Sequence, residues 1–293
     1  MTRLSDWIAG RRFARIALIA LLFPLPLLAV ISAALAVSGS VLRGWLSAAK
    51  DCAGALLLLV VITALAGGAW FEMGVGAAVT WTVAVLLGHL YRRASMTLAL
   101  QVAVLLGLAG ALAFSLWSAD PQAFWEQVLS DLAERAQSAG LEVAPEDIVP
   151  GAARLMTGMM AASAVASSVA ALFVGAWLAE SNTKRSFAAE FREVRMGRVM
   201  GFLAAIVAVM LLTGLRTTMD DLLLVLATGF VVQGLAVIHW HGARRNWPRL
   251  WLLALYLPMA LIPAVAALQL VVLALIGLAD NAVSLRRTDG KLV

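Results

Sequence analysis

The polar residues best placed for chemistry lie near the C-terminus of this 293-residue chain. Asp280 directly follows an apolar run over residues 251–279, and Arg286 comes six residues later. A carboxylate just inside the boundary of an apolar run is costly unless a basic group or a helix end accompanies it. We therefore expect Gly277, Asp280 and Arg286 to act together as a structural or partner contact. The alternative is an ordinary solvated helix end.

Serine hydroxyls form the second candidate group, at Ser163, Ser167 and Ser168 within the apolar run over residues 155–178. Alanines recur beside them at four-residue spacing, at Ala162, Ala166 and Ala170. Small residues at this spacing let helix backbones approach closely within a bilayer. We expect close helix packing at these positions, whereas a substrate path or ligand site lined by the three hydroxyls is the alternative.

The sequence lacks the common catalytic and metal-binding patterns. His239 and His241 lie about 200° apart around a helix, so they cannot close on one metal ion. The chain contains no phosphate-binding G-x-x-x-x-G-K-[ST] loop, no H-E-x-x-H helix and no G-x-S-x-G elbow. No carboxylate stands in the middle of an apolar run, where proton relays and ion-coupled carriers place one. We expect no enzymatic activity, no catalytic residue, no metal and no cofactor.

The elements that position these residues have the composition of a membrane protein. Hydrophobic residues make up 62% of the chain and charged residues 13%, against about 45–50% and 25% in soluble domains. The net charge of +5 comes from arginine clusters at the ends of apolar runs, so we expect no nucleic-acid partner. Cys52 is the only cysteine, which excludes an intramolecular disulfide. The lipid bilayer is the expected surrounding of most of this chain.

Eight apolar stretches predict an all-α, polytopic transmembrane bundle that forms a single integral membrane domain over residues 1–293. They cover residues 13–42, 53–69, 74–91, 96–117, 155–178, 199–215, 222–238 and 251–279. The first and last are about 30 residues long and contain prolines, which break or kink a helix. Each of these two runs is either a hairpin or one kinked helix, which allows up to ten crossings.

An asymmetry of charge orients the bundle. Residues 118–152 form an acidic loop, whereas residues 181–198 form a basic loop, and basic loops stay in the cytoplasm. Arginines outside the first and last stretches place both termini in the cytoplasm as well. Within the acidic loop, residues 121–140 predict an amphipathic helix with Asp120 as its N-cap. Its apolar face lies either on the membrane surface or over the outer mouth of the bundle, and its acidic face favours the cap.

Three segments resemble the YybS-like family of predicted bacterial integral membrane proteins. They are FREVRMGR at residues 191–198, QGLAVIHW at residues 233–240 and GLADNAVSLRR at residues 277–287. The aromatic residue usual between the terminal Asp and Arg of that family is replaced by residues 282–285 of this chain. The family is distantly similar to the substrate-capture subunits, or S components, of energy-coupling-factor vitamin transporters. The resemblance implies a membrane protein of unknown function and carries over no catalytic or ligand residue.

Two functions fit these features of a protein of the bacterial inner membrane. The first is a transporter component that binds a small molecule, resembles an S component and needs a partner with its own ATPase. The second is a scaffold or assembly factor whose basic loop, with Arg192 and Arg195, docks a cytoplasmic or membrane protein. An intramembrane enzyme would require a constellation of polar residues that the sequence lacks.

For the first function we expect a ligand pocket on the outer side of the bundle. It would lie beneath the amphipathic helix over residues 121–140, because that helix needs an apolar surface to cover. Ser163 and Ser167 would line it, since alanine and serine leave room for a ligand. A scaffold needs no such pocket.

The predicted orientation can be tested by labelling single cysteines in a Cys52→Ser background. We expect an impermeant thiol reagent, applied to intact cells, to label a cysteine in the loop over residues 118–152. A Glu190→Cys variant should be labelled only after the membrane is opened, since residue 190 lies in the basic loop. Labelling of residue 190 from outside intact cells would contradict this orientation.

Overall fold

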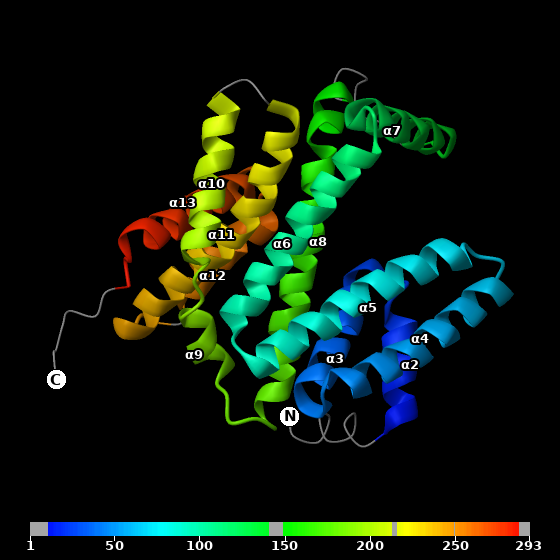
Figure 1. The fold of residues 1–293 in the computed structure, drawn as a ribbon, viewed down its shortest axis with the longest axis horizontal. Helices are drawn as coiled ribbons and strands as arrows, with labels where there is room; N and C mark the ends of the chain where they lie inside the picture. Colours follow the sequence, from blue (N-terminus) through cyan, green and yellow to red (C-terminus); the bar gives the residue numbers. More distant parts are fainter. Residues whose placement is uncertain (1–10, 141–148, 213–215, 249, 287–293) are drawn as a thin grey trace. The chain divides into compact units, whose positions relative to one another are not determined.

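The computed structural model describes residues 11–140, 149–212, 216–248 and 250–286, and throughout these ranges the regular structure is helical, with no strand. Seven of the described helices are long and apolar enough to cross a membrane. The predicted all-α, polytopic helical architecture is confirmed. The helices are α2 (Arg12–Leu22), α3 (Pro26–Arg43), α4 (Trp45–Leu65), α5 (Trp70–Arg93), α6 (Met96–Trp117), α7 (Pro121–Ser138), α8 (Val149–Glu180), α9 (Phe187–Arg192), α10 (Gly197–Leu212), α11 (Arg216–Arg244), α12 (Leu250–Leu261) and α13 (Pro263–Val283) (Figure 1).

The chain packs as two compact units. The first comprises Met1–Ala103 and Ala166–Val194, and the second comprises Val104–Val165 and Arg195–Val293. Helices α6 and α8 each contribute one part to each unit, because two of the three unit boundaries fall within them and the third falls between α9 and α10. The first unit otherwise contains α2 to α5 and α9, and the second contains α7 and α10 to α13.

The first proline-broken run is a hairpin in the first unit. The chain turns between α2 and α3, and Pro26 occupies the first position of α3, where its missing N–H is tolerated. Arg12 and Arg43, at the two outer ends of the run, both pair with Asp51. Helix α2 has 11 residues, which is about 16 Å of helix and too short to cross a core of roughly 30 Å. The run therefore turns back on itself without making two full crossings.

The last proline-broken run also folds back, in the second unit. Pro263 begins α13, and the side-chain Nε2 of Gln269 donates a hydrogen bond to the Leu255 carbonyl oxygen of α12 at 3.3 Å. These two residues lie at similar distances from the break, as in a hairpin. Helix α12 has 12 residues, or about 18 Å of helix. Like α2, this helix is shorter than the bilayer core, and neither is among the seven candidate spans of the described ranges.

Small residues and buried hydroxyls join α3 to α5 in the first unit. The Ser40 hydroxyl donates to the Val85 carbonyl oxygen at 2.9 Å, and the indole N–H of Trp81 donates to the Ser32 hydroxyl at 2.9 Å. A Cβ added to Gly88 would lie 2.7 Å from the Val37 carbonyl oxygen. The two helices are therefore close enough for backbone contact, which is how helices pack tightly in lipid.

The tightest helix pair of the second unit is α11 with α13. A Cβ added to Gly234 would lie 2.0 Å from the Leu273 carbonyl oxygen, and one added to Gly277 would lie 2.0 Å from the Phe230 carbonyl oxygen. Neither position can hold a side chain unless the helices separate. The two glycines thus fix how closely α13 approaches α11.

The amphipathic helix α7 forms as predicted, with Asp120 as its N-cap accepting a hydrogen bond from the Ala123 backbone N–H. Trp125 donates to the Thr157 hydroxyl at 2.9 Å and so ties the start of α7 to α8. Beyond this contact α7 extends sideways from the ends of α6 and α8 (Figure 1). None of its residues is buried, and Leu132 is 62% exposed. The Phe124 ring lies 5.3 Å from the Phe114 ring of α6, so the start of α7 packs on the end of α6 while the rest of its apolar face stays exposed.

The close contact of α11 and α13 predicts a selective effect of adding one methyl group. We expect Gly277→Ala to lower the free energy of unfolding by about 1–3 kcal/mol, because the new Cβ overlaps the Phe230 carbonyl oxygen. Gly110→Ala is the matched control, since a Cβ on Gly110 meets no atom within 4 Å. Thermal unfolding in mild detergent measures both. Equal stability of the two variants would contradict the backbone contact.

Candidate functional site

A buried ion pair joins Asp280 and Arg286 at the end of α13. Arg286 Nη2 lies 2.6 Å from Asp280 Oδ2, and the two side chains are 2% and 0% exposed. The Gln233 side chain of α11 donates to the same carboxylate oxygen at 2.7 Å and accepts a hydrogen bond from the Met196 backbone N–H at 2.7 Å. This network, which we call the Asp280 network, links α11, α13 and the residue before α10.

The local backbone brings these side chains together. Ser284 follows α13 in a left-handed conformation with φ of 53°, which turns the chain so that Arg286 reaches back to Asp280. Asn281 donates to the Gly197 carbonyl oxygen at 3.0 Å and so holds α13 against the start of α10. The lack of a side chain at Gly277 admits α11. The structure thus places Gly277, Asp280 and Arg286 in one packed region, as the cost of a lone carboxylate predicts.

The Asp280 network holds α11 and α13 together and leaves little room for a ligand. Asp280 is 1% exposed, and its carboxylate accepts hydrogen bonds from both Gln233 and Arg286. A general acid or base needs access to a substrate proton, which a carboxylate enclosed by its own protein donors does not have. The Asp280 carboxylate therefore contributes to helix packing.

The basic loop over residues 181–198 contains the short helix α9, which packs on α8 in the first unit. The rings of Phe187 and Phe191 lie 5.8 and 5.3 Å from that of Phe173. Arg192 donates to the Ala188 carbonyl oxygen of its own helix. Arg195, in the second unit, is exposed and interacts electrostatically with Asp280. The structure therefore brings Arg195 near the Asp280 network and leaves Arg192 on α9.

The three serines lie on α8 and line no part of the cavity described below. Ser163 and Ser167 are exposed on α8, and Ser168 is partly buried. Ser163 belongs to the second unit, whereas Ser167 and Ser168 belong to the first. The cavity described below is lined by residues of α4 and α5.

A second buried carboxylate, Asp51 of α4, lies among three guanidinium groups. Arg12, Arg15 and Arg43 approach it to within 3.2, 3.1 and 3.0 Å, and its side chain is 3% exposed. The apolar stretch over residues 53–69 predicts a later start for this helix than the structure shows, since α4 begins at Trp45. Gly44, with φ of 93°, ends α3 and starts α4 directly. We call this group the Asp51 cluster.

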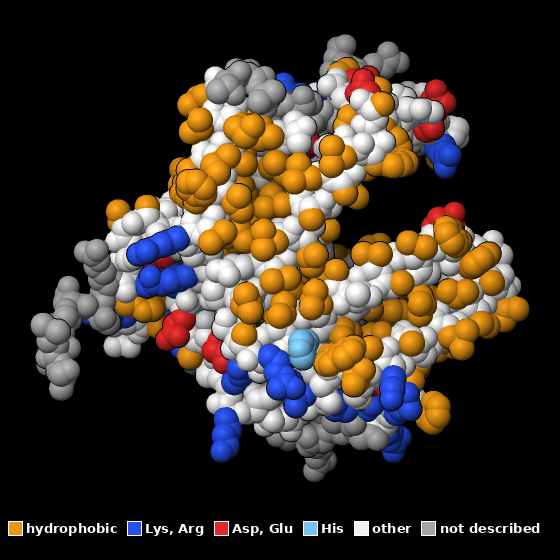
Figure 2. All heavy atoms as spheres, viewed as in Figure 1, with side chains coloured by type: hydrophobic (Ala, Val, Ile, Leu, Met, Phe, Trp, Pro, Cys, Tyr) orange, Lys and Arg blue, Asp and Glu red, His pale blue; other side chains and the backbone are white. Residues whose placement is uncertain are grey.

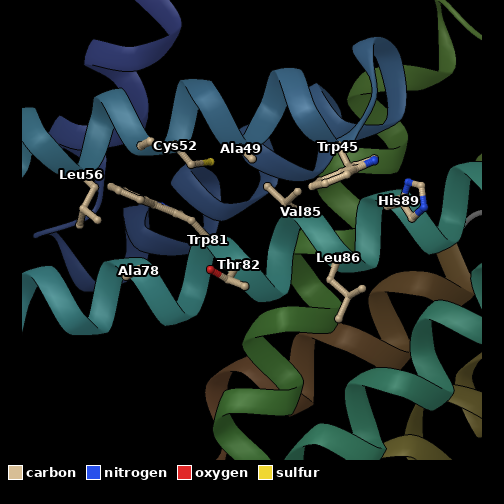
Figure 3. Close-up of a pocket in the computed structure, with 11 residues that line it drawn as sticks. Trp45, Ala49, Cys52, Leu56, Ala78, Trp81, Thr82, Val85, Leu86 and His89 are labelled. Carbon is tan, nitrogen blue, oxygen red and sulfur yellow. The ribbon is translucent and has the colours of Figure 1, made fainter.

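An apolar cavity of about 420 Å³ lies between α4 and α5 in the first unit (Figure 3). Its wall on α4 is made by Trp45, Ala49, Cys52, Ala53 and Leu56, and its wall on α5 by Ala78, Trp81, Thr82, Val85, Leu86 and His89. Figure 3 shows Trp45 and His89 at one end and Leu56 and Ala78 at the other. The few polar groups are the Thr82 hydroxyl, the His89 ring and the Trp45 indole N–H.

Small side chains make this cavity and buried hydrogen bonds hold its wall. Ala49, Ala53 and Ala78 leave space that larger residues would fill. Trp81 cannot swing into the space without breaking its hydrogen bond to Ser32, which in turn donates to the Ile19 carbonyl oxygen at 2.7 Å. The cavity therefore has one wall fixed by the α2–α3 hairpin. A preformed apolar space with a few polar groups is the usual form of a small-molecule site.

Within the described ranges, no three side chains of His, Cys, Asp or Glu gather in a way that could hold a metal ion. The chain matches no family model, and no curated protein or solved structure matches it significantly.

The Asp280 network predicts a large loss of stability when only one charge is removed. We expect Asp280→Asn to lower the free energy of unfolding by about 3 kcal/mol or more, because Arg286 stays buried without a counter-charge. The double variant Asp280→Asn, Arg286→Gln should regain part of that loss. Asp131→Asn on the exposed face of α7 is the control. If thermal unfolding shows Asp280→Asn to be as stable as the control, the ion pair does not stabilise the fold.

Proposed function

We propose that this chain is a multi-pass protein of the bacterial cytoplasmic membrane that binds an apolar small molecule in the cavity between α4 and α5. The observation that carries the proposal is the cavity itself, because its volume of about 420 Å³ lies in the range of small-molecule sites, roughly 300–1,000 Å³. Its lining supports an apolar ligand rather than a charged one, since aliphatic and aromatic side chains dominate it. Both termini and the loop over residues 181–198 lie in the cytoplasm in this proposal.

The transporter version of this function is the one we favour. A chain that binds a ligand within the membrane but carries no nucleotide-binding motif would act as a capture component and would draw energy from a partner. The resemblance of residues 191–198, 233–240 and 277–287 to the YybS-like family, and through it to S components, supports this version. The site differs from the one expected at Ser163 and Ser167, since its lining comes from α4 and α5.

A scaffold is the second candidate, and one observation favours it. Helix α9 is held in place by the Phe173 contacts and by Arg185, which donates to the Tyr91 carbonyl oxygen at the end of α5. The loop around α9 thus has a defined shape in the first unit, and in the second unit Arg195 and Arg198 are exposed. Such a surface suits an acidic protein partner. Crosslinking of this loop to a cytoplasmic protein, together with no ligand response in the cavity, would favour the scaffold.

The ligand proposal predicts that filling the cavity abolishes a thermal response. We expect at least one compound from a panel of vitamins and apolar metabolites to raise the Tm of the purified protein. Ala49→Phe should remove this response, because the ring occupies the cavity. Ala64→Phe adds the same ring on the same helix outside the lining and serves as the control. An equal rise in the Tm of Ala49→Phe and of the wild type would contradict the proposed site.

A further inference from the structure

We propose that the ligand of the α4–α5 cavity is an anionic phospholipid of the bilayer, with an acyl chain in the cavity and its phosphate against Arg92 and Arg93. This inference rests on the proposed function and names the class of molecule that the site takes. Three features of the first unit carry it: the continuity of one helix face, an unpaired positive charge at its end, and the apolar surroundings of the opening.

The face of α5 that lines the cavity leads directly to two arginines. Thr82, Val85 and His89 line the cavity at helical spacing, and the same spacing continues to Arg92 and Arg93 at the end of the helix. Side chains on a helix lean toward its N-terminus, so both arginines lean back toward His89. The Arg92 guanidinium also lies beside Gly44, next to Trp45, with Nη1 3.2 Å from where a Cβ would stand. The arginines therefore border the Trp45 and His89 end of the cavity.

These two arginines carry positive charge that no described carboxylate pairs with. Both are exposed, and among the described residues no carboxylate forms a salt bridge with either one. Nearby, the Asp51 cluster holds three cations around a single carboxylate, and Lys50 is exposed on α4. Figure 2 shows Lys and Arg side chains gathered along the edge of this unit where α5 ends. An anion at this edge would find a net positive field and two guanidinium groups suited to a phosphate.

Exposed apolar side chains on the same two helices favour a lipid over a soluble phosphate compound. Thr82 and Leu86 line the cavity and are exposed, so the space opens along the side of the helix pair. Leu57 of α4 and Val79 of α5 are 69% and 60% exposed on the same helices, and the bilayer would cover such residues. Trp45 and His89 suit the headgroup level, where amphipathic rings settle. Basic pockets at the cytoplasmic ends of membrane helices bind anionic headgroups in this way.

Native mass spectrometry of the delipidated full-length protein tests the inference with two lipids that share the same acyl chains. We expect the wild type to retain one phosphatidylglycerol per chain at least tenfold more readily than phosphatidylcholine. Arg92→Gln, Arg93→Gln should lose this preference, while Arg92→Lys, Arg93→Lys should keep most of it. Arg244→Gln, Arg245→Gln removes another exposed pair of arginines, at the end of α11 in the second unit, and should leave the preference unchanged.

The outcomes separate the lipid inference from the proposed function. If the variant Arg92→Gln, Arg93→Gln still prefers phosphatidylglycerol as strongly as the wild type, the headgroup assignment is wrong. The same follows if the Arg244, Arg245 control loses that preference equally. Neither result contradicts the cavity as a ligand site. If glycerol 3-phosphate displaces phosphatidylglycerol at equal concentration, the acyl chain contributes nothing to binding. That result would contradict a lipid as the ligand. If Ala49→Phe retains both lipids as the wild type does, the cavity is not the binding site and the proposed function fails with it.

Discussion

The Asp51 cluster is the interaction on which the first unit depends. A carboxylate buried in a membrane protein is stable only with charge partners, and here three arginines from α2 and α3 supply them. The cluster fastens the open end of the α2–α3 hairpin to α4. The hairpin in turn fixes Trp81 through Ser32, and Trp81 forms one wall of the cavity. The shape of the proposed ligand site thus depends on the ion pairs of the Asp51 carboxylate.

The second unit meets the same constraint with different parts. Its proline-broken run ends in Asp280, which takes Arg286 from beyond the helix and Gln233 from α11 as partners. Glycines rather than arginines bring the helices together, because Gly234 and Gly277 allow backbone contact. In both units a run interrupted by proline turns back within the bundle and a buried carboxylate lies near its basic end. Lipid offers no water to such groups, so each must find its partners inside the protein.

The sequence predicted the helical class, the N-cap at Asp120 and the meeting of Asp280 with Arg286, because hydrophobicity, capping and the cost of a lone charge act locally. It missed the Asp51 cluster, because Lys50 and Asp51 lie between two predicted apolar stretches and no local pattern shows that a helix begins after Gly44. The residues it favoured for a ligand, Ser163 and Ser167, do not line the α4–α5 cavity. Small residues that face lipid and small residues that face a cavity look alike in a sequence, so only the pairing of α4 with α5 reveals Ala49 and Ala78.

The most direct test is an experimental map of the purified protein in a lipid nanodisc, inspected between α4 and α5. We expect elongated density along Trp81 and Cys52 that no protein atom explains, ending near Arg92. The opposite result is a closed helix pair, with Trp81 turned against Ala49 and no space between the helices. That result would contradict a ligand site in this unit and leave the basic loop around α9 as the functional surface.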